Sequence, residues 1–208
     1  MSGKYRVLIV GMGKRGKHHA TAFHANPKFE VAGICDIDKT RTEAVAPTLG
    51  NPRQGTDALA LAMELKPDVF CFCTLPSIRL EMIKTGIKSR AKLIAFEKPV
   101  ALTSKEGMKI RDLLAKKKVK VVVSHQHRYG EHYRKVKEII KSGALGRVHT
   151  VYGTATGWMM HMMSHIIDYM RWYNGNADAS WVMAQAAGKG KFADIHSSPD
   201  YIGGIIQF

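Results

Sequence analysis

One lysine directly follows a predicted buried strand. Lys98 comes after the apolar run Leu93 to Phe96 and lies between Glu97 and Pro99. A lysine at the carboxyl end of a buried strand is desolvated, which lowers its pKa toward the range where an amine exchanges a proton with a hydroxyl or carbonyl group. Glu97 either orients this amine or serves as a structural partner. Lys98 is therefore the first candidate for a catalytic acid-base residue.

A glycine-rich turn near the amino terminus has the spacing of a dinucleotide-binding loop. The run Tyr5 to Val10 predicts a strand, and a helix is predicted from about Lys14. In such a turn the first glycine permits the bend, the second lets the backbone approach a pyrophosphate, and the third lets helix and strand pack closely. We expect the cofactor to be bound by Gly11, Met12, Gly13, Lys14, Arg15 and Gly16.

An aspartate lies where such folds usually bind the cofactor's ribose. Asp36 ends the next predicted strand, Glu30 to Cys35, at about 20 residues from the last glycine of the turn. Its carboxylate can accept hydrogen bonds from both ribose hydroxyls and would repel a 2′-phosphate, which predicts NAD rather than NADP as the cofactor. Asp38 is a second candidate, farther from the strand end.

A third segment, Thr74, Leu75 and Pro76, follows the predicted strand Asp68 to Cys73. It lies near the nicotinamide end of an extended dinucleotide or forms an ordinary strand-to-helix turn, and the local sequence supports both interpretations equally. We retain the three residues as cofactor-binding candidates together with Glu97 and Lys98.

The elements that position these residues alternate regularly through the first half of the chain. Uninterrupted β-branched and apolar strands indicate burial on both faces, hence an α/β fold with a doubly wound parallel Rossmann sheet. The predicted strands are Tyr5–Val10, Glu30–Cys35, Asp68–Cys73, Leu93–Phe96 and Val119–Val123, with helices between them.

The pattern changes after Ser124, which predicts a dinucleotide-binding domain over residues 1–124 and a partial substrate-binding and dimerisation domain over 125–208. The predicted elements of the second domain are a helix Tyr129–Ser142, a strand Gly146–Ala155, a short helix Ser164–Tyr173, and strands Ala179–Ala186 and Tyr201–Phe208. The last strand needs a neighbour that the chain does not obviously supply, and the end of the chain inside it indicates truncation.

Composition excludes several other classes of protein. The net charge is +15, but Lys and Arg are scattered and the densest run, Lys116 to Lys120, is typical of a solvated helix end rather than a nucleic-acid surface. We expect no signal peptide before Tyr5 and no membrane span, since no apolar stretch is long enough to cross a bilayer. The three cysteines, Cys35, Cys71 and Cys73, lie in apolar runs and indicate buried thiols in a reducing cytoplasm.

A methionine-rich segment, Trp158 to His165, allows a separate metal interpretation. His161 and His165 are one helical turn apart, Asp168 follows, and methionine sulfur favours copper(I). Methionines at this density more often pack a cleft or a core, so we expect no metal site.

Together these motifs resemble the Gfo/Idh/MocA family of sugar and inositol oxidoreductases over nearly the whole chain. The matching features are the glycine turn, Asp36, Glu97-Lys98-Pro99, the segment Ser142 to Val148, and the His-x-x-Asp pair His165 and Asp168. The resemblance implies a Rossmann domain followed by an open, mostly antiparallel sheet. It implies that Lys98 and His165 face the nicotinamide and that Asp168 orients the site, and it allows a cis Lys98–Pro99 peptide.

Three departures from the family pattern stand out. His161 occupies the place of an aspartate that usually precedes the catalytic histidine, and Met163 replaces a glycine. Arg79 stands where the family often has a histidine, and the chain is considerably shorter than family members.

The sequence therefore predicts a NAD-dependent oxidoreductase that transfers a hydride between nicotinamide and a polyol, sugar or related hydroxy compound. The predicted substrate-binding residues are Lys98, Arg128, His161 and His165. Either Lys98 or His165 serves as the base. The alternatives are a non-redox relative similar to the family's NAD-dependent glycosidases and a cofactor-binding regulatory protein without turnover. We expect a small-molecule substrate, a homo-oligomer, and no nucleic-acid or membrane partner.

Overall fold

The computed structural model describes residues 3–156, 159–188 and 199–208, and for residues 159–161 it describes the backbone alone. The chain divides into two compact units, unit 1 over Met1–Ser124 and unit 2 over His125–Phe208.

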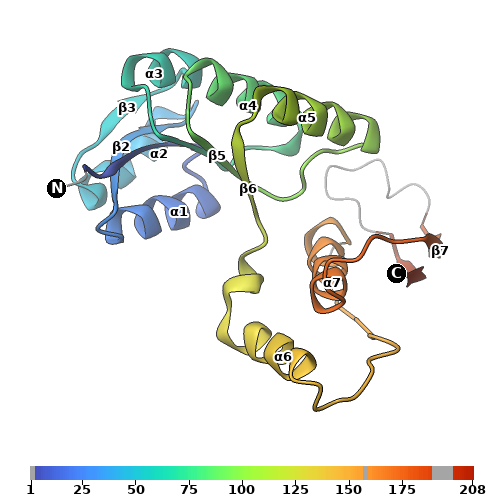
Figure 1. Ribbon diagram of the computed structural model, residues 1–208. Helices are drawn as coiled ribbons and strands as arrows, with labels where there is room; N and C mark the ends of the chain where they lie inside the picture. Colours follow the sequence, from blue (N-terminus) through green and yellow to red (C-terminus); the bar gives the residue numbers. More distant parts are fainter. Residues whose placement is uncertain (1–2, 157–158, 189–198) are drawn as a thin grey trace. The chain divides into compact units, whose positions relative to one another are not determined.

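Unit 1 alternates strands with helices (Figure 1). Its strands are β1 (Tyr5–Val10), β2 (Phe29–Cys35), β3 (Arg53–Gly55), β4 (Val69–Phe72), β5 (Leu93–Glu97) and β6 (Lys120–Ser124). Its helices are α1 (Lys14–Ala25), α2 (Lys39–Val45), α3 (Ala58–Leu65), α4 (Arg79–Lys88) and α5 (Ser104–Lys117), with short 3-10 helices η1 (Ala46–Leu49) and η2 (Pro76–Ile78).

The six strands form one parallel sheet in the order β3-β2-β1-β4-β5-β6. The strand order reverses between β1 and β4, where Val10 pairs with Phe72 at the carboxyl ends. Ligands of open α/β sheets bind in the crevice at this reversal. The predicted α/β fold with a parallel Rossmann sheet is confirmed.

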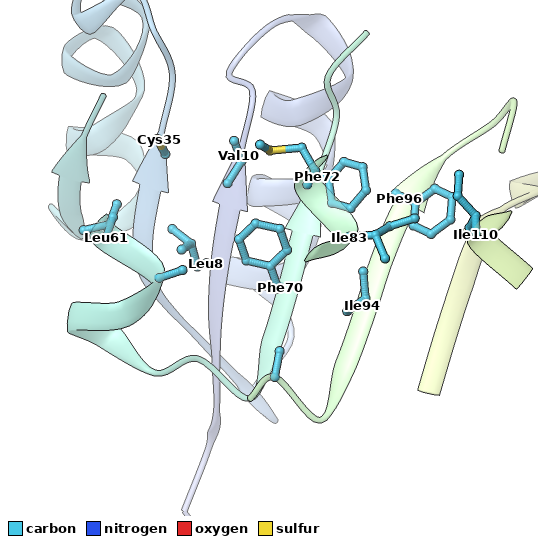
Figure 2. Close-up of a cluster of buried hydrophobic side chains, with 13 residues drawn as sticks. Leu8, Val10, Cys35, Leu61, Phe70, Phe72, Ile83, Ile94, Phe96 and Ile110 are labelled. Carbon is cyan, nitrogen blue, oxygen red and sulfur yellow. The ribbon is translucent and has the colours of Figure 1, made fainter. Parts of the chain in front are cut away.

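Two layers of apolar side chains cover the two faces of this sheet. On one face, side chains of β1, β4 and β5 pack against α3, α4 and α5, and Figure 2 shows this cluster around Phe70, Phe72 and Phe96. On the other face, Val7, Ile9 and Cys71 pack against α1, α2 and η1. Because strands buried on both faces need apolar residues at every position, the continuous apolar runs of the sequence follow directly from this layering.

The strand and helix between α2 and β4 were not predicted. β3 has only the three residues Arg53 to Gly55 and no β-branched side chain, so its pattern resembles a loop. The sequence does contain one indication of the helix α3, the capping residue Asp57. Its side chain accepts hydrogen bonds from the backbone N–H groups of Leu59 and Ala60.

Unit 2 contains η3 (Gln126–Tyr129), α6 (Glu131–Lys141), α7 (Met159–Tyr173), β7 (Trp181–Ala187) and β8 (Tyr201–Gln207). The strands β7 and β8 form an antiparallel pair, which confirms a separate second sheet and supplies β8 with the neighbour that the sequence had not revealed. The helix α7 begins at Met159, five residues before the predicted Ser164.

The predicted strand Gly146–Ala155 is wrong. The segment has no regular secondary structure, and no strand in the described part of the chain pairs with it. Alternating polarity alone does not make a strand, because its backbone groups need a hydrogen-bonding neighbour.

Among the described helices, none has the length and apolar character needed to cross a membrane.

Candidate active site

The glycine turn between β1 and α1 is built by close backbone contacts. Gly11 has φ +90° and its N–H donates a 2.7 Å hydrogen bond to the carbonyl of Cys35. A Cβ atom on Gly11 would lie 2.8 Å from the carbonyl oxygen of Cys73, and one on Gly16 would lie 1.6 Å from the carbonyl oxygen of Gly11. Both positions therefore require glycine, for the turn and for the packing of α1 against β1.

Gly13 differs from the other two glycines because it faces open space. A Cβ atom there would meet no atom of the described residues within 4 Å, and the backbone has φ −68°. Gly13 is also the N-cap of α1, and no side chain in the described part of the protein caps the helix. The first N–H groups of α1, from Lys14 onward, are therefore available for an anion, which is the arrangement that binds a pyrophosphate. The turn fits a dinucleotide on these grounds.

Asp36 lies beside this turn and stabilises it. Its side chain is 5% exposed, its Oδ2 accepts a 2.6 Å hydrogen bond from the N–H of Met12, and its Oδ1 accepts one of 3.0 Å from the N–H of Asp38. Each carboxylate oxygen keeps one further lone pair with which to accept a hydrogen bond. The carboxylate predicted to recognise the ribose thus also holds the turn, a role that the sequence did not indicate.

Asp38 and Arg41 occupy the same strand end. Asp38 caps α2 by accepting hydrogen bonds from the backbone N–H and the hydroxyl of Thr40, and the Thr40 hydroxyl is the first cause of a lowered pKa of Asp38. Arg41 places its Nη1 3.8 Å from Oδ2 of Asp36 and its Nε 3.3 Å from Oδ2 of Asp38. Arg41 was not identified from the sequence.

Glu97, at the end of β5, is the centre of a charge network with α1. Its Oε1 accepts hydrogen bonds from Nη2 of Arg15 at 2.8 Å, from Nε of Arg15 at 3.1 Å, and from Nε2 of His19 at 2.8 Å. Burial raises the pKa of Glu97, but the hydrogen bonds from His19 and Arg15 outweigh it and hold that pKa at about 2. The hydrogen bond to Glu97 in turn raises the pKa of His19.

Lys98 follows Glu97 and is half-buried at the same edge of the sheet. Burial lowers the pKa of its amine, the charge of Arg15 lowers it further, and Glu97 opposes both. The direction is the one predicted for an acid-base lysine. The Lys98–Pro99 peptide bond is cis, as the family resemblance allowed.

The loop after β4 carries Thr74, Leu75 and Pro76 at the same carboxyl edge. Thr74 contacts the glycine turn, since its Cγ2 lies 3.5 Å from the position of a Cβ on Gly11, and its buried hydroxyl makes no hydrogen bond within the described residues. Leu75 is 59% exposed, and Pro76 begins η2. The Thr74 hydroxyl therefore keeps unused hydrogen-bonding capacity beside the glycine turn.

Arg79 ties this loop to the loop after β5. Its side chain is 1% exposed, and its guanidinium donates hydrogen bonds to the carbonyls of Thr74 at 3.4 Å and Pro99 at 3.1 Å. It also lies over the stacked rings of Phe72 and Phe96, 5.5 and 5.4 Å from their centroids. Burial lowers the pKa of Arg79 to about 10. From the sequence, Arg79 was noted only as a departure from the family pattern, and its hydrogen bonds to the two loops were not predicted.

In unit 2, Asp168 on α7 is held by an arginine. Nε and Nη2 of Arg128 donate to Oδ2 and Oδ1 of Asp168, each at 2.7 Å, and Nδ1 of His125 lies 3.6 Å from Oδ2. A bidentate pair of this kind fixes both partners in orientation. Arg128, predicted to touch substrate, has its guanidinium committed to Asp168.

His165 lies in a stack of aromatic rings within the same unit. It is 4% exposed, and its ring stacks on that of His127 at 4.6 Å and meets that of His125 edge-on at 5.5 Å. His127 also forms a hydrogen bond with the hydroxyl of Tyr169. Three histidines, His125, His127 and His165, thus lie together with Asp168 in unit 2.

A cavity of about 550 Å³ lies beside this stack. It is lined by His127, Tyr133, Thr154, Ala155, Thr156, Met162, Ile166 and Tyr169. Aromatic ring faces and threonine hydroxyls are groups that suit a small molecule with both apolar and polar faces.

The side chain of His161 lies outside the described residues, so the structure gives no geometry for the copper interpretation that used it. Among the side chains that are described, no three His, Cys, Asp or Glu residues are grouped as ligands of a metal ion.

Residues 5–125 match the model of an oxidoreductase family with an NAD-binding Rossmann fold. The chain is 24% identical over 155 residues to D-glucoside 3-dehydrogenase of Escherichia coli, covering 74% of this chain and 44% of that protein. It is 26% identical over 146 residues to inositol 2-dehydrogenase of Rhizobium meliloti, covering 70% of this chain and 43% of that one.

Among solved structures, scyllo-inositol dehydrogenase of Lactobacillus casei with bound NAD(H) and scyllo-inositol has a TM-score of 0.77 at 18% identity. The match covers 90% of this chain and 61% of that one. At this identity the likeness shows the fold. The matched regions cover less than half the length of the two curated relatives named above.

Proposed function

Because the chain belongs to the Gfo/Idh/MocA oxidoreductase family, we propose that it is a NAD-dependent dehydrogenase acting on CH–OH groups. The observation that carries this proposal is the shared carboxyl edge of the sheet in unit 1. There the N-terminus of α1, which no described side chain caps, the carboxylate of Asp36 and the amine of Lys98 follow the carboxyl ends of β1, β2 and β5 in the same parallel sheet. An anion site, a ribose acceptor and an acid-base group are the three things that NAD-dependent redox chemistry needs from a protein.

The substrate in this proposal is a polyol, a sugar or a related hydroxy compound. The matched relatives are named for inositol and glucoside substrates. A cavity in unit 2 lined by aromatic rings and threonine hydroxyls supports the same class, since polyols present alternating apolar C–H and polar O–H groups.

Bound NAD would supply a hydride acceptor. Lys98 would take the hydroxyl proton of the substrate and stabilise the developing alkoxide, because its lowered pKa makes the neutral amine more accessible near neutral pH. His165 is the other candidate for the base. Asp168 would act through Arg128 by fixing the surroundings of His165, since its carboxylate is engaged in the bidentate pair.

NAD is preferred over NADP in this proposal. The negative charge of Asp36 at the end of β2 disfavours a 2′-phosphate, and Arg41 only partly offsets it, since its Nη1 is 3.8 Å away.

A cofactor-binding regulatory protein without turnover is the second candidate. One observation favours it: His161 stands where the family usually has an aspartate beside the catalytic histidine. Loss of that carboxylate would remove a partner of the histidine while leaving the cofactor cradle of unit 1 intact.

One experiment separates these candidates. The chain is titrated with NAD and NADP by protein fluorescence, and then incubated with a panel of inositols, sugars and glucosides while the absorbance of reduced nicotinamide is followed. Reduction with at least one polyol or sugar supports the dehydrogenase. NAD binding without reduction selects the regulatory protein, and release of an aglycone without net reduction selects a glycosidase-like relative. Failure to bind NAD would overturn all three.

Two further expectations belong to this proposal. We propose a homo-oligomer, because the apolar side chains of Trp181, Val182 and Met183 on β7 are exposed. Light scattering over a range of protein concentrations tests it, and a monomer throughout would contradict it. A cytoplasmic location agrees with the three cysteines, which are present as thiols.

A further inference from the structure

Arg79, the first residue of α4, is a buried cation that forms no ion pair with a carboxylate among the described residues. Its side chain is 1% exposed, and its guanidinium donates hydrogen bonds to the carbonyls of Pro99 at 3.1 Å and Thr74 at 3.4 Å. Its Nε–H is also buried and meets no acceptor in the described part of the chain. Burial of a cation costs free energy, and an apolar residue of similar volume often gives equal or greater stability. Stability alone therefore does not account for Arg79.

The rings of Phe72 and Phe96 orient this guanidinium. Their centroids are 5.1 Å apart with the ring planes at 12°, and Figure 2 shows both rings within the buried cluster. The Cζ atom of Arg79 lies 5.5 and 5.4 Å from the two centroids. A planar guanidinium held against ring faces presents its N–H groups as a rigid fork. The fork therefore sets the positions of the two carbonyls that it bonds, those of Thr74 and Pro99.

Pro99 is the residue directly after Lys98. Residues 98–103 belong to no helix or strand, so the sheet holds this loop only at its start, where β5 ends at Glu97. The hydrogen bond from Arg79 holds the loop one residue beyond Lys98, and the proline ring fixes the φ angle there. The backbone of Lys98 is thus held on both sides, by β5 before it and by Arg79 after it.

We propose that Arg79 is a positioning residue for Lys98, which holds the Lys98 amine in the orientation that a substrate hydroxyl requires. Arg79 acts through the carbonyl of Pro99 and sets the loop of Thr74 at the same edge of the sheet. Turnover depends steeply on the placement of an acid-base group, so the contribution falls on kcat rather than on the affinity for NAD. This inference rests on the proposed function, because it assigns proton transfer to Lys98.

The placement of the amine is tested first, without turnover. Competitive acetylation of the lysines with trace acetic anhydride across a range of pH, read peptide by peptide by mass spectrometry, gives a labelling midpoint for each lysine. Burial is the first cause of the lowered pKa of Lys98, so its amine titrates at higher pH when it is released into solvent. In Arg79→Met we expect the Lys98 midpoint to rise by about half a pH unit or more. An unchanged Lys98 midpoint in the folded variant would overturn the proposal.

A control within the same helix separates positioning from a general effect of losing a cation. Lys84 is an exposed cation of α4, and Lys84→Met is expected to leave the Lys98 midpoint unchanged. The methionine of Arg79→Met can keep apolar contact with Phe72 and Phe96, so we expect its melting temperature to stay within about 5 °C of the wild-type value. A larger fall, with an unchanged Lys98 midpoint where the variant is folded, would assign Arg79 a structural role alone and overturn the proposal.

Steady-state kinetics on the polyol or sugar that is oxidised fastest give the second readout. Arg79→Met is expected to lower kcat about tenfold or more and to leave the Kd of NAD within about threefold. Arg79→Lys keeps the charge and can donate to a carbonyl but lacks the planar fork, so its kcat and its Lys98 midpoint should lie between those of wild type and Arg79→Met. Wild-type kcat in Arg79→Met, or an equal loss of kcat and of NAD affinity, would overturn the proposal.

Two outcomes need separate readings. If Arg79→Met does not fold, Arg79→Lys decides, and a Lys98 midpoint and kcat equal to those of wild type would overturn the proposal. If the wild-type chain binds no NAD or reduces it with no compound of the panel, the proposed dehydrogenase has failed. The labelling midpoint of Lys98 then still decides whether Arg79 holds its amine in place.

Discussion

His19 donates a hydrogen bond of 2.8 Å to Oε1 of Glu97, although 78 residues separate the two in the sequence. The contact joins α1, which carries the glycine turn, to the end of β5, which precedes Lys98. The cofactor cradle and the candidate acid-base residue are thus connected through one carboxylate.

The His19–Glu97 contact predicts a pH-dependent contribution to stability. The pKa of His19 is raised in the folded chain, so its contribution is fully present below the unfolded pKa of 6.5 and is lost as the pH rises through the folded pKa. The pKa of Glu97 is lowered from 4.5 to about 2, so its contribution is present above pH 4.5 and is lost as the pH falls toward 2. We therefore expect His19→Gln to lower the free energy of unfolding of unit 1 more at mildly acidic pH, between 4.5 and 6.5, than at alkaline pH.

Urea unfolding of wild type and variant across this range measures the difference. His18→Gln is the matched control, because His18 is a neighbouring exposed histidine of the same helix. A stability difference for His19→Gln that does not change with pH would contradict the prediction.

The glycine turn provides a pair of substitutions with opposite expected results. Gly16→Ala places a Cβ 1.6 Å from a backbone oxygen, so we expect a loss of stability of about 3 kcal/mol or more. Gly13→Ala meets open space at an allowed φ of −68°, so we expect a nearly unchanged melting temperature. Because the new methyl group occupies the space needed by a pyrophosphate, NAD affinity should fall about tenfold or more. Thermal melts and fluorescence titration measure both, and unchanged NAD affinity in Gly13→Ala would show that the dinucleotide does not lie on this turn.

The double role of Asp36 predicts two effects from one substitution. Asp36→Ala removes the acceptor of the Met12 N–H and should cost about 1–3 kcal/mol of stability, because a buried donor loses its partner. The substitution should also weaken the binding of NAD more than the binding of NADP, so that the difference between the two affinities becomes smaller. Parallel titrations of both cofactors, at a temperature where the variant is folded, test this. Equal weakening of NAD and NADP would show that Asp36 supports the turn without recognising the ribose.

Substitution of Lys98 is expected to reduce turnover without a comparable loss of cofactor binding. Lys98→Met should reduce turnover by about 10²-fold or more, as expected for removal of a positioned acid-base group. Lys98→Arg keeps the positive charge but cannot deprotonate, so it should be about as inactive. Steady-state rates on the best substrate of the panel, together with NAD titration, measure this. High activity in Lys98→Arg would assign Lys98 an electrostatic role and leave His165 as the base.

The pair Arg128 and Asp168 predicts coupled effects within unit 2. Each single alanine substitution should destabilise this unit by about 1–3 kcal/mol, since it leaves a partly buried charge without its partner. The double substitution should cost less than the sum of the two, by about 1 kcal/mol or more. Hydrogen exchange of amides in α6 and α7 reports on unit 2 alone. Additive effects would show that the 2.7 Å contacts contribute little to stability.

The sequence was sufficient for the parts of the molecule that local patterns determine. The continuous apolar strands β1, β2, β4 and β5 and the spacing from Gly16 to Asp36 predicted the parallel sheet and its cofactor edge. The three-residue β3 was missed because its pairing with Gly33 to Cys35 is a property of the sheet rather than of its own residues. The segment 146–155 was assigned as a strand for the converse reason, since alternation was present and a pairing neighbour was not.

Long-range contacts account for what the sequence did not show at the site. The spacing of four between Arg15 and His19 places both on one face of α1, but the sequence alone assigned no role to His19. Only the fold shows that this face meets Glu97. In the same way, the distance of Arg128 from Asp168 along the chain concealed their bidentate pairing, and Cys73 was grouped with Cys71 as a buried thiol although it is partly exposed.

The position of Arg79 has a consequence for motion at the cofactor edge. Its guanidinium bonds to the loops after both β4 and β5 and is held against Phe72 and Phe96. If one loop moved alone, the buried guanidinium of Arg79 would lose a hydrogen-bond acceptor, which costs free energy. We therefore expect Thr74 and Pro99 to move together. The two loops are thereby coupled mechanically, so we expect a displacement of one of them at this edge of the sheet to be transmitted to the other through Arg79.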